Sequence, residues 1–171
     1  IRNEIWIVPT VGCVNGIAER LARQLEKETQ LKGIDGIHAW HHNYGCSQLG
    51  DDHENTRKVL RDICQHPNTG GVLVISLGCE NNQPEDFMKL LGDYDTERIR
   101  LLITQQVEGD ELEAGMNILR KLYHKAAQDQ REEVSVNKLR IGLKCGGSDG
   151  FSGITANPLV GAFSDWRSEE R

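Results

Sequence analysis

Short apolar runs alternate along the chain with longer runs in which apolar residues recur every three or four positions. Val72–Leu77 is the clearest short run, and it is apolar at both odd and even positions, as expected for a central parallel strand covered on both faces. Asn15–Thr29 has the other pattern. Its apolar residues Ile17, Leu21 and Leu25 lie four apart, which predicts an amphipathic helix with one buried face.

The same two patterns predict ten segments from end to end. Strands are expected at Glu4–Pro9, Gly36–His42, Val72–Leu77, Arg100–Thr104 and Leu139–Leu143, helices at Asn15–Thr29, Asp52–Cys64, Pro84–Leu91 and Asp110–Gln128, and a polar surface loop at Gln128–Asn137. Strands that alternate with helices indicate an α/β fold with an open, mainly parallel sheet of about five strands and helices on both faces. This is the three-layer arrangement of Rossmann-like and flavodoxin-like domains.

Length and charge narrow the class of protein. A chain of 171 residues suits a single α/β domain over 1–171. The formal charge of −6 argues against a nucleic-acid partner, which would need a basic face for phosphates. No apolar run reaches the roughly 18 residues of a membrane span, and no signal peptide is evident. We therefore expect no membrane partner, a cytoplasmic location and reduced thiols.

Four of the five cysteines follow predicted strands directly. Cys13, Cys46, Cys79 and Cys145 come after the first, second, third and fifth strand, whereas Cys64 lies in a helix and is assigned to the core. The carboxyl ends of parallel strands share one edge of a sheet, and ligand sites form there. The four residues are therefore candidate metal ligands, with burial as small apolar side chains as the alternative.

The loops after the first two strands add polar groups. Asn15 ends a glycine-containing loop that opens a helix, which could present N–H groups to a carboxylate. A tight turn with an asparagine cap is as plausible. The second loop carries His42, Tyr44 and Gln48 around its cysteine, and a histidine beside a cysteine can ligate a transition metal or transfer protons.

The loops after the third and fourth strands are abruptly polar. Glu80 is the best carboxylate candidate for acid–base chemistry, and Asn81 beside it is a candidate for binding substrate. The alternative is helix capping by Asn82 before Pro84. Gln105 occupies the corresponding position after the fourth strand, where no thiol occurs.

The stretch after the fifth predicted strand is rich in glycine and hydroxyl groups. Its candidate substrate-binding residues are Gly146, Gly147, Ser148, Asp149, Ser152, Thr155 and Asn157. Backbone nests and hydroxyls of this kind suit a polyhydroxylated acid. A disordered linker is the alternative, and the apolar Phe151, Ile154 and Leu159 argue against it.

Several segments together resemble the altronate/galactarate dehydratase family, which also includes sulfolactate sulfo-lyase. They are TVGCVNG from residue 10, YGCSQLGDD from residue 44, GGVLVISLGCENNQ from residue 70 and KCGGSDGFSGITANPLVGAFSD from residue 144. The resemblance runs from Ile1 to about Asp165. The stretch Cys46–Asp52 is most similar to the altronate-specific branch.

The resemblance implies loss of water from D-altronate to give 2-dehydro-3-deoxy-D-gluconate, with iron(II) or manganese(II) as the cofactor. A divalent metal could stabilise the charge that develops beside the carboxylate, and His42, Tyr44 and Glu80 are the candidate acid and base. The resemblance also implies a small β-rich domain before this chain and a large segment after it. We expect these segments and a small-molecule sugar acid as partners, a possible homo-oligomer, and little activity from the fragment alone.

Two alternatives stay open at this point. Galactarate or sulfolactate could be the substrate on the same scaffold, because a few pocket positions decide substrate choice. The chain could instead be a non-catalytic module that holds a metal or an iron–sulfur cluster. The lack of a C-x-x-C pair argues mildly against such a module.

Overall fold

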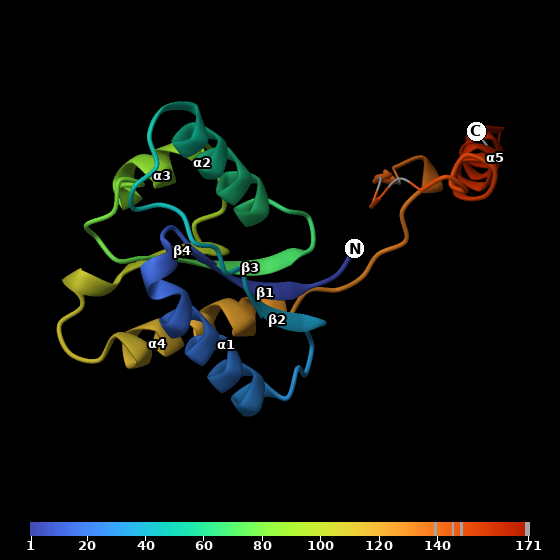
Figure 1. Ribbon diagram of the computed structural model, residues 1–171. Helices are drawn as coiled ribbons and strands as arrows, with labels where there is room; N and C mark the ends of the chain where they lie inside the picture. Colours follow the sequence, from blue (N-terminus) through green and yellow to red (C-terminus); the bar gives the residue numbers. More distant parts are fainter. Residues whose placement is uncertain (139, 145, 148, 170–171) are drawn as a thin grey trace. The chain divides into compact units, whose positions relative to one another are not determined.

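The computed structural model describes residues 1–138, 140–144, 146–147 and 149–169, without the side chains of 167–169 (Figure 1). It forms two compact units, Ile1–Gln130 and Arg131–Arg171. None of the helices in the described part of the chain is long and apolar enough to cross a membrane.

The first unit is built on one parallel sheet. Its strands are β1 (Glu4–Pro9), β2 (Gly36–Ala39), β3 (Thr69–Ser76) and β4 (Ile99–Ile103), in the order β2-β1-β3-β4. The helices between and after them are α1 (Asn15–Thr29), α2 (Gly50–Cys64), α3 (Pro84–Leu90) and α4 (Glu111–Ala126), with short 3-10 turns η1 (Gly12–Val14) and η2 (Thr104–Gln106). The predicted open α/β sheet with helices on both faces is confirmed, with four strands rather than five.

Alternate strand residues build two cores, one on each face of the sheet. Ile5, Ile7, Leu73 and Ile75 pack with buried residues of α1 and α4. Trp6, Val8, Val72 and Val74 pack with Leu60 and Cys64 of α2 and Phe87 of α3. Figure 1 shows the same layers, with α1 and α4 on one side of the strands and α2 and α3 on the other. Burial on both faces explains why the strand sequences are almost continuously apolar.

The helix boundaries follow local signals that the sequence already carries. Asp110 caps α4, because its side chain accepts hydrogen bonds from the backbone N–H groups of Leu112 and Glu113. Pro84 opens α3, where its missing N–H costs nothing. In α2, Leu60 is buried, whereas the neighbouring Val59 is 57% exposed.

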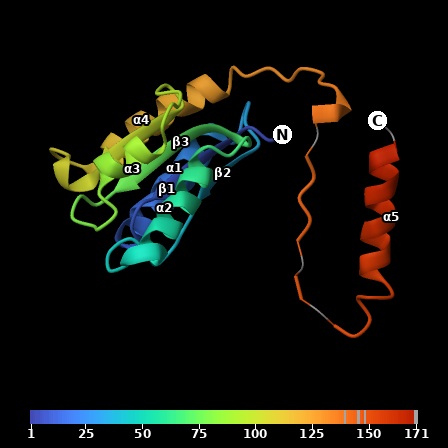
Figure 2. The same ribbon diagram turned by 90° about the horizontal axis from the view of Figure 1, so that it is seen from above.

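The second unit corrects the prediction of a fifth strand at Leu139–Leu143. Residues 140–143 have no regular structure, and Leu139 lies outside the described residues. Ile141 is 45% exposed and Leu143 is 61% exposed, so burial does not offset the entropy lost on ordering the backbone. The unit contains a short turn, η3 (Val136–Lys138), and the helix α5 (Ala156–Glu169), which the sequence patterns did not predict (Figure 2).

Candidate active site at the strand ends

The direction in which successive strands are added to the sheet reverses at β1. The connection from β1 through α1 leads to β2 on one side, and β3 lies on the other side of β1. In open parallel sheets, ligands bind outside the carboxyl ends of the strands at this kind of switch point. The loops after β1 and β3, together with the loop after β2, are therefore the candidate site.

The three strand-end cysteines that the structure describes are on these loops. Cys13, Cys46 and Cys79 are free and exposed. Cys64 is buried in the core, as predicted, and burial raises the pKa of its thiol to about 12. Cys145 lies outside the described residues.

The donor set for a metal ion is incomplete in the described part of the chain. No three or more His, Cys, Asp and Glu side chains of the described residues come together in a group that could hold a metal. Ligation by Cys13, Cys46, Cys79 and Cys145 therefore stays a prediction.

Hydrogen bonds tie the three loops to one another. The backbone N–H of Gly12 donates to the Tyr44 carbonyl at 2.9 Å, and the backbone N–H of Asn82 donates to the Gly45 carbonyl at 3.2 Å. The Asn82 side-chain amide donates to the Thr10 carbonyl at 3.3 Å. Such cross-links make the rim of the sheet a preorganised surface rather than three independent loops.

His42 is held by backbone groups on both sides of its ring. Its Nε2 lies 2.8 Å from the Pro9 carbonyl, and its Nδ1 lies 3.1 Å from the backbone N–H of Tyr44. This pair of partners selects the neutral tautomer in which Nε2–H donates and Nδ1 accepts. The carbonyl of His42 also accepts from the Asn15 side chain at 2.8 Å. His42 thus joins its loop to the end of β1, and it must release one of these bonds before it can transfer a proton.

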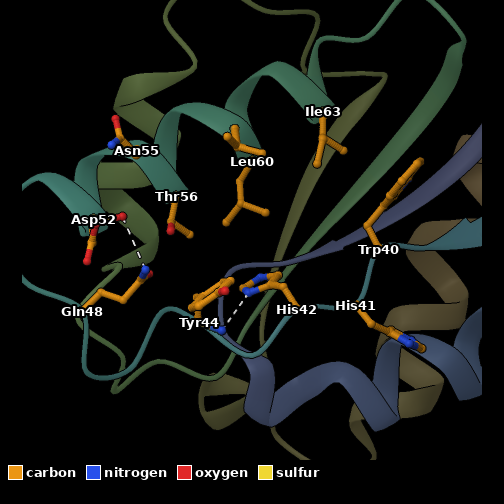
Figure 3. A pocket seen from close by; sticks show the side chains of 11 residues that line it. Trp40, His41, His42, Tyr44, Gln48, Asp52, Asn55, Thr56, Leu60 and Ile63 are labelled. Atoms are coloured by element: carbon orange, nitrogen blue, oxygen red, sulfur yellow. Dashed lines mark hydrogen bonds between the residues drawn. The ribbon is translucent and has the colours of Figure 1, made fainter. Parts of the chain in front are cut away.

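A cavity of about 480 Å³ lies between the loop after β2 and helix α2 (Figure 3). Its walls are formed by Trp40, His41, His42, Tyr44, Gln48, Asp52, Asn55, Thr56, Val59, Leu60 and Ile63. Three of the predicted site residues, His42, Tyr44 and Gln48, are among them. The rings of His42 and Tyr44 stack at 6.2 Å, and Tyr44 is 56% exposed. The Oε1 atom of Gln48 is buried without a hydrogen-bond partner in the described part of the chain, so it is available to a ligand donor.

Glu80 is buried under the rim, where four donors surround its carboxylate. Oε1 accepts from the hydroxyls of Thr10 at 2.6 Å and Ser76 at 2.5 Å, and from the backbone N–H of Leu77 at 3.3 Å. Oε2 accepts from the backbone N–H of Gly78 at 2.6 Å. Burial alone would raise the pKa of this carboxyl, but the hydrogen bonds from Ser76 and Thr10 outweigh it and lower the pKa below its usual value.

Two further predicted residues face solvent beside Glu80. The Asn81 side chain donates to the Gln48 carbonyl at 3.3 Å. Gln105 lies next to Cys79, with its side-chain N–H 3.8 Å from the sulfur. Cys79 therefore lies against the turn after β4, whereas Asn81 contacts the loop after β2.

Sequence reasoning missed the buried polar residues under the rim. Thr10 and Ser76 bind the Glu80 carboxylate, and Asn82 binds the Thr10 carbonyl instead of capping α3. The sequence signal that could have revealed them is a hydroxyl residue at the end of each of two otherwise apolar strands, Thr10 after β1 and Ser76 in β3.

The predicted substrate-binding residues of the last loop belong to the second unit. There the Asp149 carboxylate accepts from the backbone N–H groups of Phe151 at 2.8 Å and Ser152 at 2.9 Å, which forms a tight turn before α5. The Thr155 hydroxyl donates to the Phe151 carbonyl. Gly146, Gly147 and Asn157 are exposed, and Ser148 lies outside the described residues.

Two family models match the chain. The D-galactarate dehydratase/altronate hydrolase second-domain model matches residues 1–127, and the D-galactarate/altronate dehydratase C-terminal model matches residues 136–170. The boundary between the two compact units lies in the gap between these two matches. No solved structure is significantly similar to the chain.

Similar proteins of known name cover almost the whole chain. An altronate dehydratase of Escherichia coli K12 is 55% identical over 97% of this chain and 34% of its own length. An altronate dehydratase of Bacillus subtilis 168 is 53% identical over 97% of this chain and 33% of its own length. A galactarate dehydratase (L-threo-forming) of Escherichia coli K12 is 34% identical over 96% of this chain and 34% of its own length. The chain thus spans about a third of the length of these relatives.

Proposed function

The chain belongs to the D-galactarate dehydratase/altronate hydrolase family, and from this premise we propose that it supplies the strand-end part of the active site of an altronate dehydratase. The proposed reaction is the loss of water from D-altronate to give 2-dehydro-3-deoxy-D-gluconate. Because the chain spans about a third of its relatives' length, the proposal concerns the activity of the complete protein.

One observation carries the choice of substrate. Identity to the two altronate dehydratases is 55% and 53%, against 34% to the galactarate dehydratase and 28% to the β subunit of a (2R)-sulfolactate sulfo-lyase of Chromohalobacter salexigens. A few pocket residues distinguish substrates on a shared scaffold, and such residues are best retained between close relatives. Altronate is therefore the first substrate to test, and galactarate and sulfolactate are the alternatives.

The reaction needs a base for the proton at C2 of the acid and an acid for the hydroxyl that leaves C3. The C2–H bond breaks, the C3–O bond breaks, and the resulting enol takes up a solvent proton at C3 to become the 2-keto acid. Tyr44 is the most exposed of the three candidate groups, and beside it the Nε2–H of His42 donates to the Pro9 carbonyl. The proposal also includes the side-chain amides of Asn15, Asn81 and Gln105 as candidate groups that bind the hydroxyl or carboxylate oxygens of the substrate.

The family resemblance adds iron(II) or manganese(II) to this proposal. The described residues do not by themselves form a ligand set for either ion, so the steps above do not run through a metal. Metal analysis of the purified full-length protein, before and after a chelator, tests the requirement directly.

The product formed in heavy water tests the proposed reaction. Full-length protein incubated with D-altronate in D₂O is expected to give 2-dehydro-3-deoxy-D-gluconate with one deuterium at C3, because solvent supplies the proton on ketonisation. Proton NMR of the C3 methylene measures it. Recovery of unchanged altronate, with metal supplied, would contradict the proposal.

A further inference from the structure

The loop after β3 alternates between buried and exposed side chains. Cys79 and Asn81 are exposed, whereas Glu80 and Asn82 are each only 1% exposed. Residues 79–82 thus direct two polar side chains into the protein and two toward the rim. A polar side chain is buried at a cost unless it is hydrogen-bonded, so the two inward residues are expected to have fixed partners.

Glu80 meets this expectation, because both of its carboxylate oxygens accept hydrogen bonds. Its four donors come from the end of β1 through Thr10, from β3 through Ser76, and from the loop itself through the N–H groups of Leu77 and Gly78. Two successive N–H groups that converge on one carboxylate form an anion nest, here filled by a side chain of the same loop. With both oxygens hydrogen-bonded to the protein and only 1% of its surface exposed, Glu80 does not face the rim where a substrate would bind.

Asn82 fixes the other end of the same segment. Its side-chain amide donates to the Thr10 carbonyl, and its backbone N–H donates to the Gly45 carbonyl. The first bond reaches the loop after β1 and the second reaches the loop after β2. Glu80 and Asn82 therefore hold the segment on both sides of Asn81, whose side chain is exposed.

The backbone at Gly78 is part of the same arrangement. Its φ is +117°, a conformation that favours glycine, and a Cβ atom there would lie 3.1 Å from Ile103 and 3.2 Å from Gln105. The turn thus brings Cys79 against Gln105, whose side-chain N–H lies 3.8 Å from the sulfur. Removing the Glu80 carboxylate would leave the Gly78 N–H without its acceptor, and the turn that positions Cys79 would be less well fixed.

We infer that Glu80 and Asn82 are positioning residues that fix the loop after β3, and that Cys79 and Asn81 are the groups that this loop presents to the substrate. This assignment deepens the proposed dehydratase function and rests on it. Glu80 is therefore no longer a candidate acid or base, because a group that exchanges a proton with the substrate must be able to reach the substrate.

Hydrogen exchange tests the positioning role without any assay of activity. In the full-length protein, Glu80→Gln should raise amide exchange in residues 77–81 selectively, because a neutral amide cannot accept from all four donors. The matched control is Glu85→Gln, an exposed carboxylate of α3, which should leave exchange in that segment unchanged. If Glu80→Gln lowers the yield of folded protein, Ser76→Ala removes one donor and serves as the milder variant. Unchanged exchange in both variants would overturn the positioning role.

Kinetics separate a positioning residue from a catalytic one. Glu80→Gln should lower kcat/KM by up to about 10²-fold, through misplacement of the loop, and keep the shape of the pH–rate profile. Loss of one limb of that profile would make Glu80 the acid or base and overturn the inference. Cys79→Ser and Asn81→Ala should lower kcat/KM without a change in exchange, and full activity in both would overturn their role. If the parent protein dehydrates no sugar acid, the proposed function fails, while the exchange result still decides the role of Glu80.

Discussion

At the scale of single residues, the site depends on close contact between backbones. Gly45 lies where the loop after β2 crosses the loop after β1, with a φ of +103°, and a Cβ atom there would overlap the Thr10 carbonyl oxygen. The same crossing carries the bonds from Asn82 to Thr10 and Gly45. A side chain at this position would therefore separate the loops that form the rim.

Gly45→Ala should destabilise the protein by about 2 kcal/mol or more, because it combines an unfavourable backbone conformation with a steric overlap. Gly16→Ala is the matched control. Gly16 lies in α1 with open space around it, so alanine should change stability by no more than about 1 kcal/mol, in the stabilising direction. Urea unfolding of both variants measures the difference, and equal stabilities would show that the loops do not cross as described.

Alkylation should divide the described cysteines into two classes. Cys13, Cys46 and Cys79 are exposed and should react with iodoacetamide in the folded protein, whereas Cys64 should react only after unfolding, because its thiol is buried and its pKa is raised. Mass spectrometry of the digested protein identifies each site. Rapid labelling of Cys64 under native conditions would contradict its place in the core.

The sequence located Cys13, Cys46 and Cys79 on strand-end loops of the first unit, but it could not show which polar side chains of these loops are buried. The position of Cys13, Cys46 and Cys79 follows from strand boundaries alone, because parallel strands end at a common edge. The burial of Glu80 depends on Thr10, which lies 70 residues away in the chain, and on Ser76. Contacts of this kind arise from packing, so a carboxylate on a rim loop and a carboxylate under it look alike in sequence.

At the scale of elements, an ion pair joins the residues after α4 to the start of β4. The two terminal nitrogens of Arg98 donate to the Asp129 carboxylate at 2.8 and 2.6 Å, and Arg98 also donates to the Gly70 carbonyl at 2.8 Å. The hydrogen bond from Arg98 lowers the pKa of Asp129 below its usual range. The contact therefore fixes the end of α4 against the start of β3 and β4.

Asp129→Asn should remove a pH-dependent part of the stability. A carboxyl whose pKa is lowered on folding stabilises the fold above its unfolded pKa of roughly 3.9, and this contribution is lost as pH falls through the folded value. Because the pair is partly exposed, the expected loss at neutral pH is only about 0.5–1 kcal/mol. Thermal melts from pH 7 to pH 2 should show the two proteins converging at low pH. A difference that stays constant across this range would contradict the account.

The elements themselves were largely predictable. Periodic apolar residues located α1 at its observed bounds, and the continuous apolar run located β3. The wrong predictions concern the second unit. The apolar residues Ile141 and Leu143 suggested a strand but are exposed, and α5, which follows a glycine-rich turn, was not predicted. Apolar spacing predicts an element only where another element covers the apolar face.

At the scale of the whole molecule, topology explains why residues from distant segments form one rim. The order β2-β1-β3-β4 places the switch point between β1 and β3, so the loops with Cys13 and Cys79 lie on either side of it. The loop after β2 completes the rim through its bonds to both neighbours. The chain spans about a third of the length of the two altronate dehydratases that it matches, so the proposed function concerns the complete protein.

The most direct test of the central claim is the kcat/KM of the full-length protein for D-altronate, galactarate and sulfolactate, measured in parallel with iron(II) or manganese(II) supplied. We predict that kcat/KM is highest for D-altronate and that D-altronate yields the 2-keto-3-deoxy acid. A higher value for galactarate, release of sulfite from sulfolactate, or no turnover of any of the three would contradict it.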